Sequence, residues 1–221
     1  MVRYFGPKEV ATAVIQRQPE VVLKPGKVNA LLVGSGIPAK LSIPRKLALE
    51  IALRRALKEP VPKVIDAGAL YLLHKNSKYL SSPTIITPHN GELAVLLEID
   101  TQEIATSPIA HAKDAAKRFD VVVLLKGYET ILTDGNRVIK MPAASSWLAT
   151  AGTGDVLAGL LGALIALNNC DASIEIKNKE LLEIGATAAF IHAQAADALK
   201  GPVISSNLIP EISKIIKNLS R

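Results

Sequence analysis

Residues 149–159, ATAGTGDVLAG, combine a glycine-rich turn, the start of an apolar helix and a single carboxylate, Asp155. A helix N-terminus presents unpaired backbone N–H groups and a partial positive charge, so it attracts anions. Gly152 and Gly154 lack a Cβ atom, which lets the backbone of this glycine turn (residues 152–154) come close to a phosphate. Asp155 then has two possible roles: it caps the helix, or it acts as a base beside a phosphate bound by the same amides.

Other polar residues and glycines follow short apolar runs that are typical of strands. They are Gly34 with Gly36, Asp66, His89 with Asn90 and Glu92, and Lys126 with Gly127. In an open α/β sheet, ligands bind beyond the carboxyl ends of the strands, so the positions of these residues predict a site there. The alternative is that strand ends are polar because loops are exposed. Lys126 either neutralises a phosphate or is a solvated lysine, and His89 either transfers protons or is an exposed turn residue. Glu92 is explained by the dipole of the helix that it begins.

The elements that must position these residues follow from the apolar pattern. Helices are predicted at 7–18, 44–59, 107–119, 154–168, 179–199 and 207–219. Strands are predicted at 21–23, 30–34, 63–68, the start of 84–92 and 121–127, and a hairpin is predicted around residues 134–136. Four apolar strands separated by helices and followed by a hairpin predict one α/β domain over residues 1–221. Its sheet is expected to be mainly parallel, with an antiparallel edge.

The composition narrows the class of function. Hydrophobic residues make up 49% of the 221 residues, and 26 Lys and Arg against 20 Asp and Glu give a net charge of +6. Basic residues are scattered rather than clustered with aromatics, which argues for a small anionic ligand and against nucleic acid. The single cysteine, Cys170, excludes an internal disulfide and a four-thiolate metal centre. The start of the chain is not typical of a signal peptide, and the apolar run at 156–167 is too short to span a bilayer, so we expect a cytoplasmic protein.

The chain resembles the ADP/ATP-dependent NAD(P)H-hydrate dehydratases, a metabolite-repair branch of the ribokinase-like superfamily. The resemblance is carried by VIDAGAL (64–70), TPHNGEL (87–93), VVLLKGYETILTDG (122–135) and LATAGTGDVLAG (148–159), and more weakly by FIHAQAADAL (190–199) and ISSNLIPEI (204–212). It covers roughly residues 20–215 and implies a ribokinase-like three-layer fold. It also implies a lyase that dehydrates hydrated NADH or NADPH. In that reaction a phosphoryl group of ADP or ATP is transferred to the hydrate hydroxyl and the phosphate ester is then eliminated.

The resemblance also implies roles for individual residues. Gly152, Thr153 and Gly154 would bind the transferring phosphoryl group, and Asp155 would deprotonate the hydroxyl. The remaining roles are nucleotide binding by Lys126, Gly127 and Thr130 and substrate binding by His89, Asn90, Gly34, Gly36 and Asp66. Mg²⁺ would offset phosphate charge, and no metal site formed by the protein alone is expected. The family is often oligomeric, so a homo-oligomer is expected.

The chain departs from the family pattern in three places. The family begins with some sixty further residues that have no counterpart here, so an N-terminally shortened fold is expected, with an exposed sheet edge that oligomerisation would cover. Residues 142–148 read PAASSWL where the family has an asparagine and glycines, and Asn207 stands where an aspartate is usual. Two alternative functions stay open: a thiazole- or pyrimidine-type small-molecule kinase, and a truncated relative that binds nucleotide without turnover.

Overall fold

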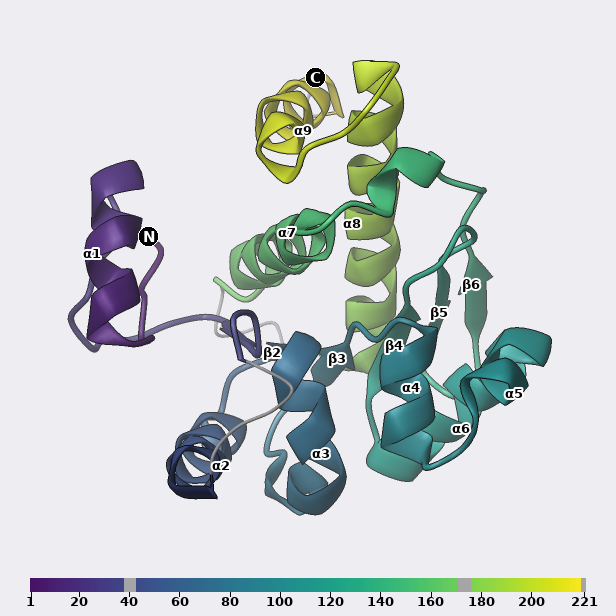
Figure 1. The fold of residues 1–221 in the computed structure, drawn as a ribbon, viewed down its shortest axis with the longest axis horizontal. Coiled ribbons are helices and arrows are strands. Elements are labelled where there is room, and N and C mark those ends of the chain that lie inside the picture. The colour runs from purple at the N-terminus through teal and green to yellow at the C-terminus, as the bar shows by residue number, and fades with distance from the viewer. Residues whose placement is uncertain (38–42, 171–175, 220–221) are drawn as a thin grey trace.

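The protein folds around one six-stranded sheet, as a computed structural model describing residues 1–37, 43–170 and 176–219 shows (Figure 1). The strands are arranged in chain order across the sheet: β1 (Leu31–Val33), β2 (Lys63–Ile65), β3 (Thr84–Ile86), β4 (Val122–Leu125), β5 (Ile131–Thr133) and β6 (Val138–Lys140). The pairs from β1 to β4 are parallel, and β5 pairs antiparallel with both β4 and β6. The mainly parallel sheet and the hairpin at its edge are therefore confirmed.

Helices cover both faces of the sheet and make a three-layer structure. The helices are α1 (Lys8–Arg17), α2 (Ile43–Lys58), α3 (Leu70–Asn76), α4 (Asn90–Leu97), α5 (Thr101–Thr106), α6 (Pro108–Phe119), α7 (Thr153–Asn168), α8 (Asn178–Leu199) and α9 (Ser205–Leu219). Short 3₁₀ turns lie at Ala67–Ala69, Ser77–Tyr79 and Ser146–Leu148. Helices α2 to α6 cover one face, and α7 to α9 cover the other. Among the helices described, none combines the length and apolar composition needed to cross a membrane.

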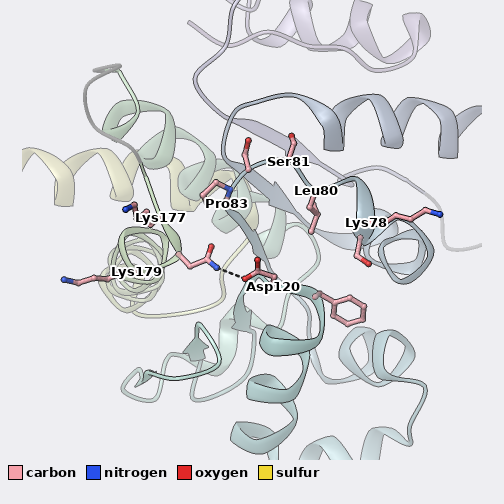
Figure 2. Close-up of a pocket in the computed structure, with 11 residues that line it drawn as sticks. Lys78, Leu80, Ser81, Pro83, Asp120, Lys177 and Lys179 are labelled. Carbon is pink, nitrogen blue, oxygen red and sulfur yellow. Dashed lines mark hydrogen bonds between the residues drawn. The ribbon is translucent and has the colours of Figure 1, made fainter.

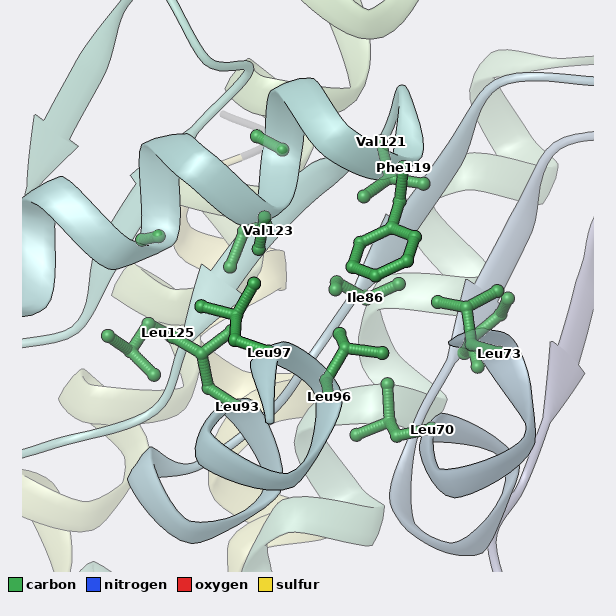
Figure 3. Close-up of a cluster of buried hydrophobic side chains, with 14 of the residues drawn as sticks. Leu70, Leu73, Ile86, Leu93, Leu96, Leu97, Phe119, Val121, Val123 and Leu125 are labelled. Atoms are coloured by element: carbon green, nitrogen blue, oxygen red, sulfur yellow. The ribbon is translucent and has the colours of Figure 1, made fainter. Parts of the chain in front are cut away.

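The sheet is buried on both faces because alternate residues of its central strands point to opposite cores. Ile86 and Val123 contribute to the core under α3, α4 and α6, where they lie near Leu70, Leu93 and Phe119 (Figure 3). Their neighbours in β3 and β4 contribute to the core under α7 and α8. This two-sided burial explains why the central strands read as continuous apolar runs in the sequence.

The strand predicted at 21–23 is wrong. Val22 makes only an isolated parallel bridge with Arg3, outside the sheet. The two residues belong to an N-terminal unit whose helix α1 lies apart from the layers on the β1 side (Figure 1), and Ala11 is the residue of α1 that is buried. A run of three apolar residues does not specify a partner strand, and Val22 therefore pairs locally.

Candidate active site

A cluster of three charged side chains, Asp66, Glu92 and Lys126, lies at the carboxyl ends of β2, β3 and β4. Lys126 Nζ is 2.9 Å from Asp66 Oδ1 and 3.7 Å from Glu92 Oε2. Both carboxylates are buried, with 2% of Asp66 and 7% of Glu92 exposed. Thr87 Oγ1 donates a further hydrogen bond of 2.7 Å to Asp66 Oδ1. Within this charged cluster one cation therefore balances two carboxylates, and the cluster keeps an excess of negative charge.

Helix α4 and the end of β4 hold this cluster together. The Lys126 N–H donates to the Pro88 carbonyl at 2.8 Å, and a parallel bridge pairs Lys126 with His89 just beyond the ends of β4 and β3. His89 caps α4: its Nδ1 accepts from the N–H groups of Gly91 and Glu92, at 3.0 and 3.3 Å. Glu92 accepts in return from the His89 N–H at 2.9 Å. This capping box fixes Glu92 beside Lys126.

The end of β1 approaches Asp66 through a glycine. Gly34 has a φ of +123°, and a Cβ atom there would overlap the carbonyl oxygen of Asp66. The Asp66 N–H donates to the Val33 carbonyl at 3.0 Å, so the two strand ends are in direct contact. Gly36 also has a positive φ, +79°, but no atom lies within 4 Å of its Cβ position. Gly34 is thus required for the close approach, whereas Gly36 lies in open space.

We expect Gly34→Ala to lower the free energy of unfolding by about 2–4 kcal/mol, because a side chain at this φ is strained and its Cβ meets backbone. Gly36→Ala is the matched control, because it meets strain without a clash, and it should cost only about 1–2 kcal/mol. Urea denaturation of both variants measures the difference. Equal losses would show that the contact with Asp66 contributes nothing.

The glycine turn lies next to the charged cluster. Gly152 precedes α7 with a left-handed φ of +86°, and Thr153 Oγ1 donates to the carbonyls of Leu148 and Thr150, at 2.7 and 2.8 Å. A Cβ atom on Gly154 would lie 3.5 Å from Lys126 Nζ, which places the lysine against the first turn of α7. The Thr153 N–H donates to the Thr150 carbonyl at 3.3 Å. The helix N-terminus beside a lysine ammonium is an arrangement suited to binding an anion.

Asp155 occupies the first turn of α7 and is exposed. Among the described residues, no hydrogen bond or ion pair involves its carboxylate, and the N-cap residue Gly152 has no side-chain cap. The capping role considered from the sequence therefore has no hydrogen bond to support it here. The carboxylate stands exposed beside amides that can bind an anion.

Asp155 faces a hollow between α7 and α9, which we call the α7–α9 groove. Its volume is about 500 Å³, and it is lined by Gly152, Asp155, Val156, Gly159, Leu160, Ser205, Ile209, Ile212 and Ser213. Ser205 Oγ is 2.9 Å from the position that a Cβ atom on Gly152 would take. A larger hollow of about 680 Å³ lies at the amino ends of β3 and β4, next to Asp120 and Lys179 (Figure 2). None of the predicted site residues lines it, whereas Gly152 and Asp155 line the α7–α9 groove.

A buried histidine on α8 forms a hydrogen bond with the glycine turn. His192 Nε2 is 3.0 Å from the carbonyl oxygen of Thr153, and 6% of the residue is exposed. Burial lowers the pKa of His192 to about 4, and the hydrogen bond to Thr153 opposes this shift only in part. The ring is therefore neutral at pH 7, and Nε2 carries the proton that it donates to the Thr153 carbonyl.

This depressed pKa predicts a stability change with pH. Unfolded protein binds a proton at His192 near pH 6.5, whereas the folded protein does so only near pH 4. The unfolded state therefore binds more protons between these values, and the free energy of unfolding should fall by about 3 kcal/mol as the pH drops through this window. Denaturant titrations at several pH values measure it, with His192→Gln as the control that lacks this contribution. An identical pH slope in that variant would contradict the assignment.

The structure brings only some of the predicted residues together. Asp66, His89 and Gly154 all lie against Lys126. Asp155 follows Gly154 in the first turn of α7. Gly127 is exposed, and the Thr130 hydroxyl lies 3.5 Å from the Gly127 carbonyl rather than at the charged cluster. The partly buried Asn90 side chain has no hydrogen bond within the described part of the chain.

Three residues of the site were not predicted as such: Thr87, His192 and Ser205. Thr87 lies in TPHNGEL and His192 in FIHAQAADAL. The presence of these residues in motifs shared with the family was the sequence feature that could have indicated a role in the site. Ser205 lies in ISSNLIPEI. Glu92 was noted in the sequence, but only as a partner for a helix dipole. Its contact with Lys126 depends on the packing of β3 against β4.

The fold is the ribokinase-like three-layer fold. Solved structures with this architecture include a ribokinase-like superfamily protein from Enterococcus faecalis, with a TM-score of 0.76 and 19% identity, covering 96% of this chain and 74% of that one. The ADP/ATP-dependent NAD(P)H-hydrate dehydratase from Bacillus subtilis, co-crystallised with ATP and Mg²⁺ and soaked with CoA, gives a TM-score of 0.75 at 19% identity and covers 96% and 78%. A hydroxyethylthiazole kinase from Pyrococcus horikoshii is more distant, with a TM-score of 0.59.

The chain belongs to the NAD(P)H-hydrate dehydratase family, whose model matches residues 1–218. It is 35% identical to a bifunctional NAD(P)H-hydrate repair enzyme of Corynebacterium glutamicum, over 89% of this chain and 37% of that protein. It is 30% identical to the ADP-dependent (S)-NAD(P)H-hydrate dehydratase of Nitrosopumilus maritimus, over 87% and 63% respectively. The chain thus spans about a third of the bifunctional relative and less than two thirds of the dehydratase.

Proposed function

We propose that the protein dehydrates hydrated NADH or NADPH with ADP or ATP as the phosphoryl donor. The hydrate hydroxyl oxygen attacks the terminal phosphorus of the nucleotide, whose bridging P–O bond breaks. The carbon–oxygen bond of the resulting ester then breaks as inorganic phosphate leaves, and loss of a proton from the neighbouring carbon restores the double bond. The observation that carries this proposal is the position of Lys126 Nζ against Gly154, in the helix turn that also carries the exposed carboxylate of Asp155.

Each part of this site has a task in the proposed reaction. The amides of the glycine turn stabilise charge on the transferring phosphoryl group. Lys126 neutralises a phosphate oxygen, and Asp155 takes the proton from the attacking hydroxyl. Gly127 and Thr130 would contact the nucleotide further along its phosphates. His89, Asn90, Gly34, Gly36 and Asp66 would face or shape the space for the hydrated nicotinamide nucleotide.

Charge balance supports a role for Mg²⁺. Asp66, Glu92 and Asp155 bring three carboxylates to the region where Lys126 supplies one positive charge. Nucleotide phosphates would add further negative charge, which a divalent cation offsets. Mg²⁺ typically keeps several waters and binds through substrate phosphates and one or two carboxylates. The excess of carboxylates over cations in this region fits a magnesium ion that is bound mainly through the nucleotide phosphates.

Exposed apolar side chains near the N-terminus suggest that copies of the chain assemble with one another. We propose a homo-oligomer in the cytoplasm that acts on a small molecule rather than on nucleic acid or a membrane. Support for assembly comes from β1, which forms one edge of the sheet and leaves 39% of Leu32 exposed. Apolar side chains of the N-terminal unit, including Val2 and Phe5, are also exposed.

The test is to incubate the purified protein with NADH hydrate and Mg²⁺, in separate reactions with ADP and ATP. We expect recovery of the near-ultraviolet absorbance of the reduced nicotinamide, with release of one phosphate per hydrate repaired. No recovery with either nucleotide would overturn the proposal. A stable phosphorylated product formed from a thiazole or pyrimidine alcohol would indicate the kinase instead. Nucleotide binding without any turnover would indicate a non-catalytic relative.

A further inference from the structure

The glycine turn is held by few backbone hydrogen bonds of its own, among them one of 3.3 Å from the Thr153 N–H to the Thr150 carbonyl. Gly152 adopts a left-handed conformation, and glycine has more accessible conformations than any other residue. The first N–H groups of α7 have no partner within the helix. To bind an anion at low cost, these amides must already point the same way before the anion arrives. Some part of the surrounding structure therefore has to hold the turn in place.

Thr153, the first residue of α7, is held from two sides. Its hydroxyl donates to carbonyls that precede the turn, those of Leu148 and Thr150. Its own carbonyl accepts the hydrogen bond from His192 Nε2 at 3.0 Å, across 39 positions of sequence. The hydroxyl ties the turn to its own approach segment, whereas His192 ties it to α8. Helix α8 is 22 residues long and packs on the sheet, so it is a rigid support.

We propose that His192 is a positioning residue for the glycine turn, holding the Thr153 carbonyl so that the Gly154 N–H of the same peptide unit stays oriented for the phosphoryl group. The identity of that anion as a nucleotide phosphoryl group rests on the proposed function. The hydrogen bond between His192 and Thr153 is seen in the structure and does not depend on that function. Because the His192 ring is buried and contacts the Thr153 carbonyl, the histidine acts through the turn rather than by direct contact with nucleotide or hydrate.

A purely structural role for His192 makes a different prediction. A buried histidine that only fills space can be replaced by any side chain of similar volume with little effect on the turn. A positioning role instead requires a donor at the place of Nε2. Glutamine places its amide nitrogen near that position, whereas phenylalanine fills the volume without a donor. Leu182, which is fully buried and ten residues earlier on α8, supplies a control about 15 Å away along the helix.

The experiment compares His192→Gln, His192→Phe and Leu182→Ala with the wild-type protein. Hydrogen exchange of the amides in residues 150–157 is measured without ligand, and the Kd for ADP and for ATP with Mg²⁺ is measured by calorimetry. We expect His192→Phe to speed exchange in this segment and to weaken nucleotide binding about three- to tenfold, the range of one net hydrogen bond. His192→Gln should restore both values to within about twofold. Leu182→Ala should lower the Tm while leaving both unchanged.

Two outcomes would overturn the proposal. The first is wild-type exchange of residues 150–157 in His192→Phe, and the second is a folded His192→Gln that behaves like His192→Phe. The exchange measurement needs no ligand, so it decides even if nucleotide binds weakly. If the wild-type protein binds nucleotide but does not dehydrate the hydrate, the proposed function fails. The role of His192 is still supported in that case when exchange and affinity change as described.

Discussion

Asp155→Asn is expected to lower the rate of hydrate dehydration by about a thousandfold or more. Asparagine has nearly the same shape as aspartate but does not accept a proton at neutral pH. General-base assistance contributes about 10²–10⁴-fold, and alignment of the attacking hydroxyl adds to that. Because Asp155 is exposed and makes no hydrogen bond within the described residues, the substitution breaks no existing contact.

Nucleotide binding should not weaken in Asp155→Asn. A carboxylate beside the phosphate site repels the anion, so its removal should leave the Kd for ADP or ATP unchanged or make it smaller. The free energy of unfolding should fall by less than about 1 kcal/mol, because one favourable charge at the N-terminus of α7 is lost. A large loss of rate with intact binding and folding is the pattern that distinguishes a base from a binding residue.

Asp114→Asn is the matched control, because Asp114 is also an exposed helical carboxylate without a hydrogen bond among the described residues. Its rate should equal that of the wild-type protein. The two variants are compared in the same absorbance assay at saturating nucleotide, with a calorimetric Kd for each. An Asp155→Asn protein that keeps more than a tenth of the wild-type rate would exclude Asp155 as the base.

The fold was largely predictable because of how its strands are buried. Strands β2, β3 and β4 are buried on both faces, so they read as mainly apolar runs, and helix α7 follows as a long apolar segment. The strand predicted at residues 21–23 was wrong because no buried sheet position determines the structure there. Those residues lie outside the sheet, where a short apolar run has no fixed partner. The pattern of apolar residues therefore predicts a strand or helix correctly where that element packs in the core.

The site was predictable to the extent that topology alone determines it. Parallel strands end at one edge, and this brought Asp66, His89 and Lys126 together from separate motifs. The contacts that hold them were not predictable, because they join residues far apart in sequence: 60 positions separate Lys126 from Asp66 and 39 separate His192 from Thr153. A single sequence gives no distance between such residues, so Glu92 and His192 read as ordinary helix residues.

Lys126→Met is expected to lower both the stability of the protein and its affinity for nucleotide. The lysine lies between Asp66 and Glu92, two carboxylates that are almost fully buried. Removing the cation leaves both charges without their counter-ion, and breaking a buried pair in this way costs about 3–5 kcal/mol. Because 22% of the Lys126 side chain is exposed, we expect a smaller loss in the free energy of unfolding, about 2–4 kcal/mol. The Kd for ADP should rise by more than about tenfold, since one charged phosphate contact is lost.

Lys140→Met is the matched control, since Lys140 also forms an ion pair, at 2.8 Å from Glu129, but with both side chains about half exposed. An exposed pair is worth about 0–1 kcal/mol, so this variant should change neither the unfolding free energy nor the Kd measurably. Urea denaturation and calorimetry on both proteins measure the contrast. Similar losses in the two variants would show that burial of the charged cluster has no energetic consequence.

A double variant separates the pairing of charges from the loss of side-chain packing. Asp66→Asn removes one buried charge while keeping an oxygen that can still accept from Thr87. If Lys126 serves to balance Asp66, then Asp66→Asn combined with Lys126→Met should lose less stability than the sum of the two single variants, by about 1–3 kcal/mol. Nucleotide affinity should not recover in the same double variant, because the cation that binds phosphate is still absent. Recovery of stability without recovery of binding is expected only if Lys126 both balances the buried carboxylates and binds the phosphate. Additive losses of stability would contradict the pairing with Asp66.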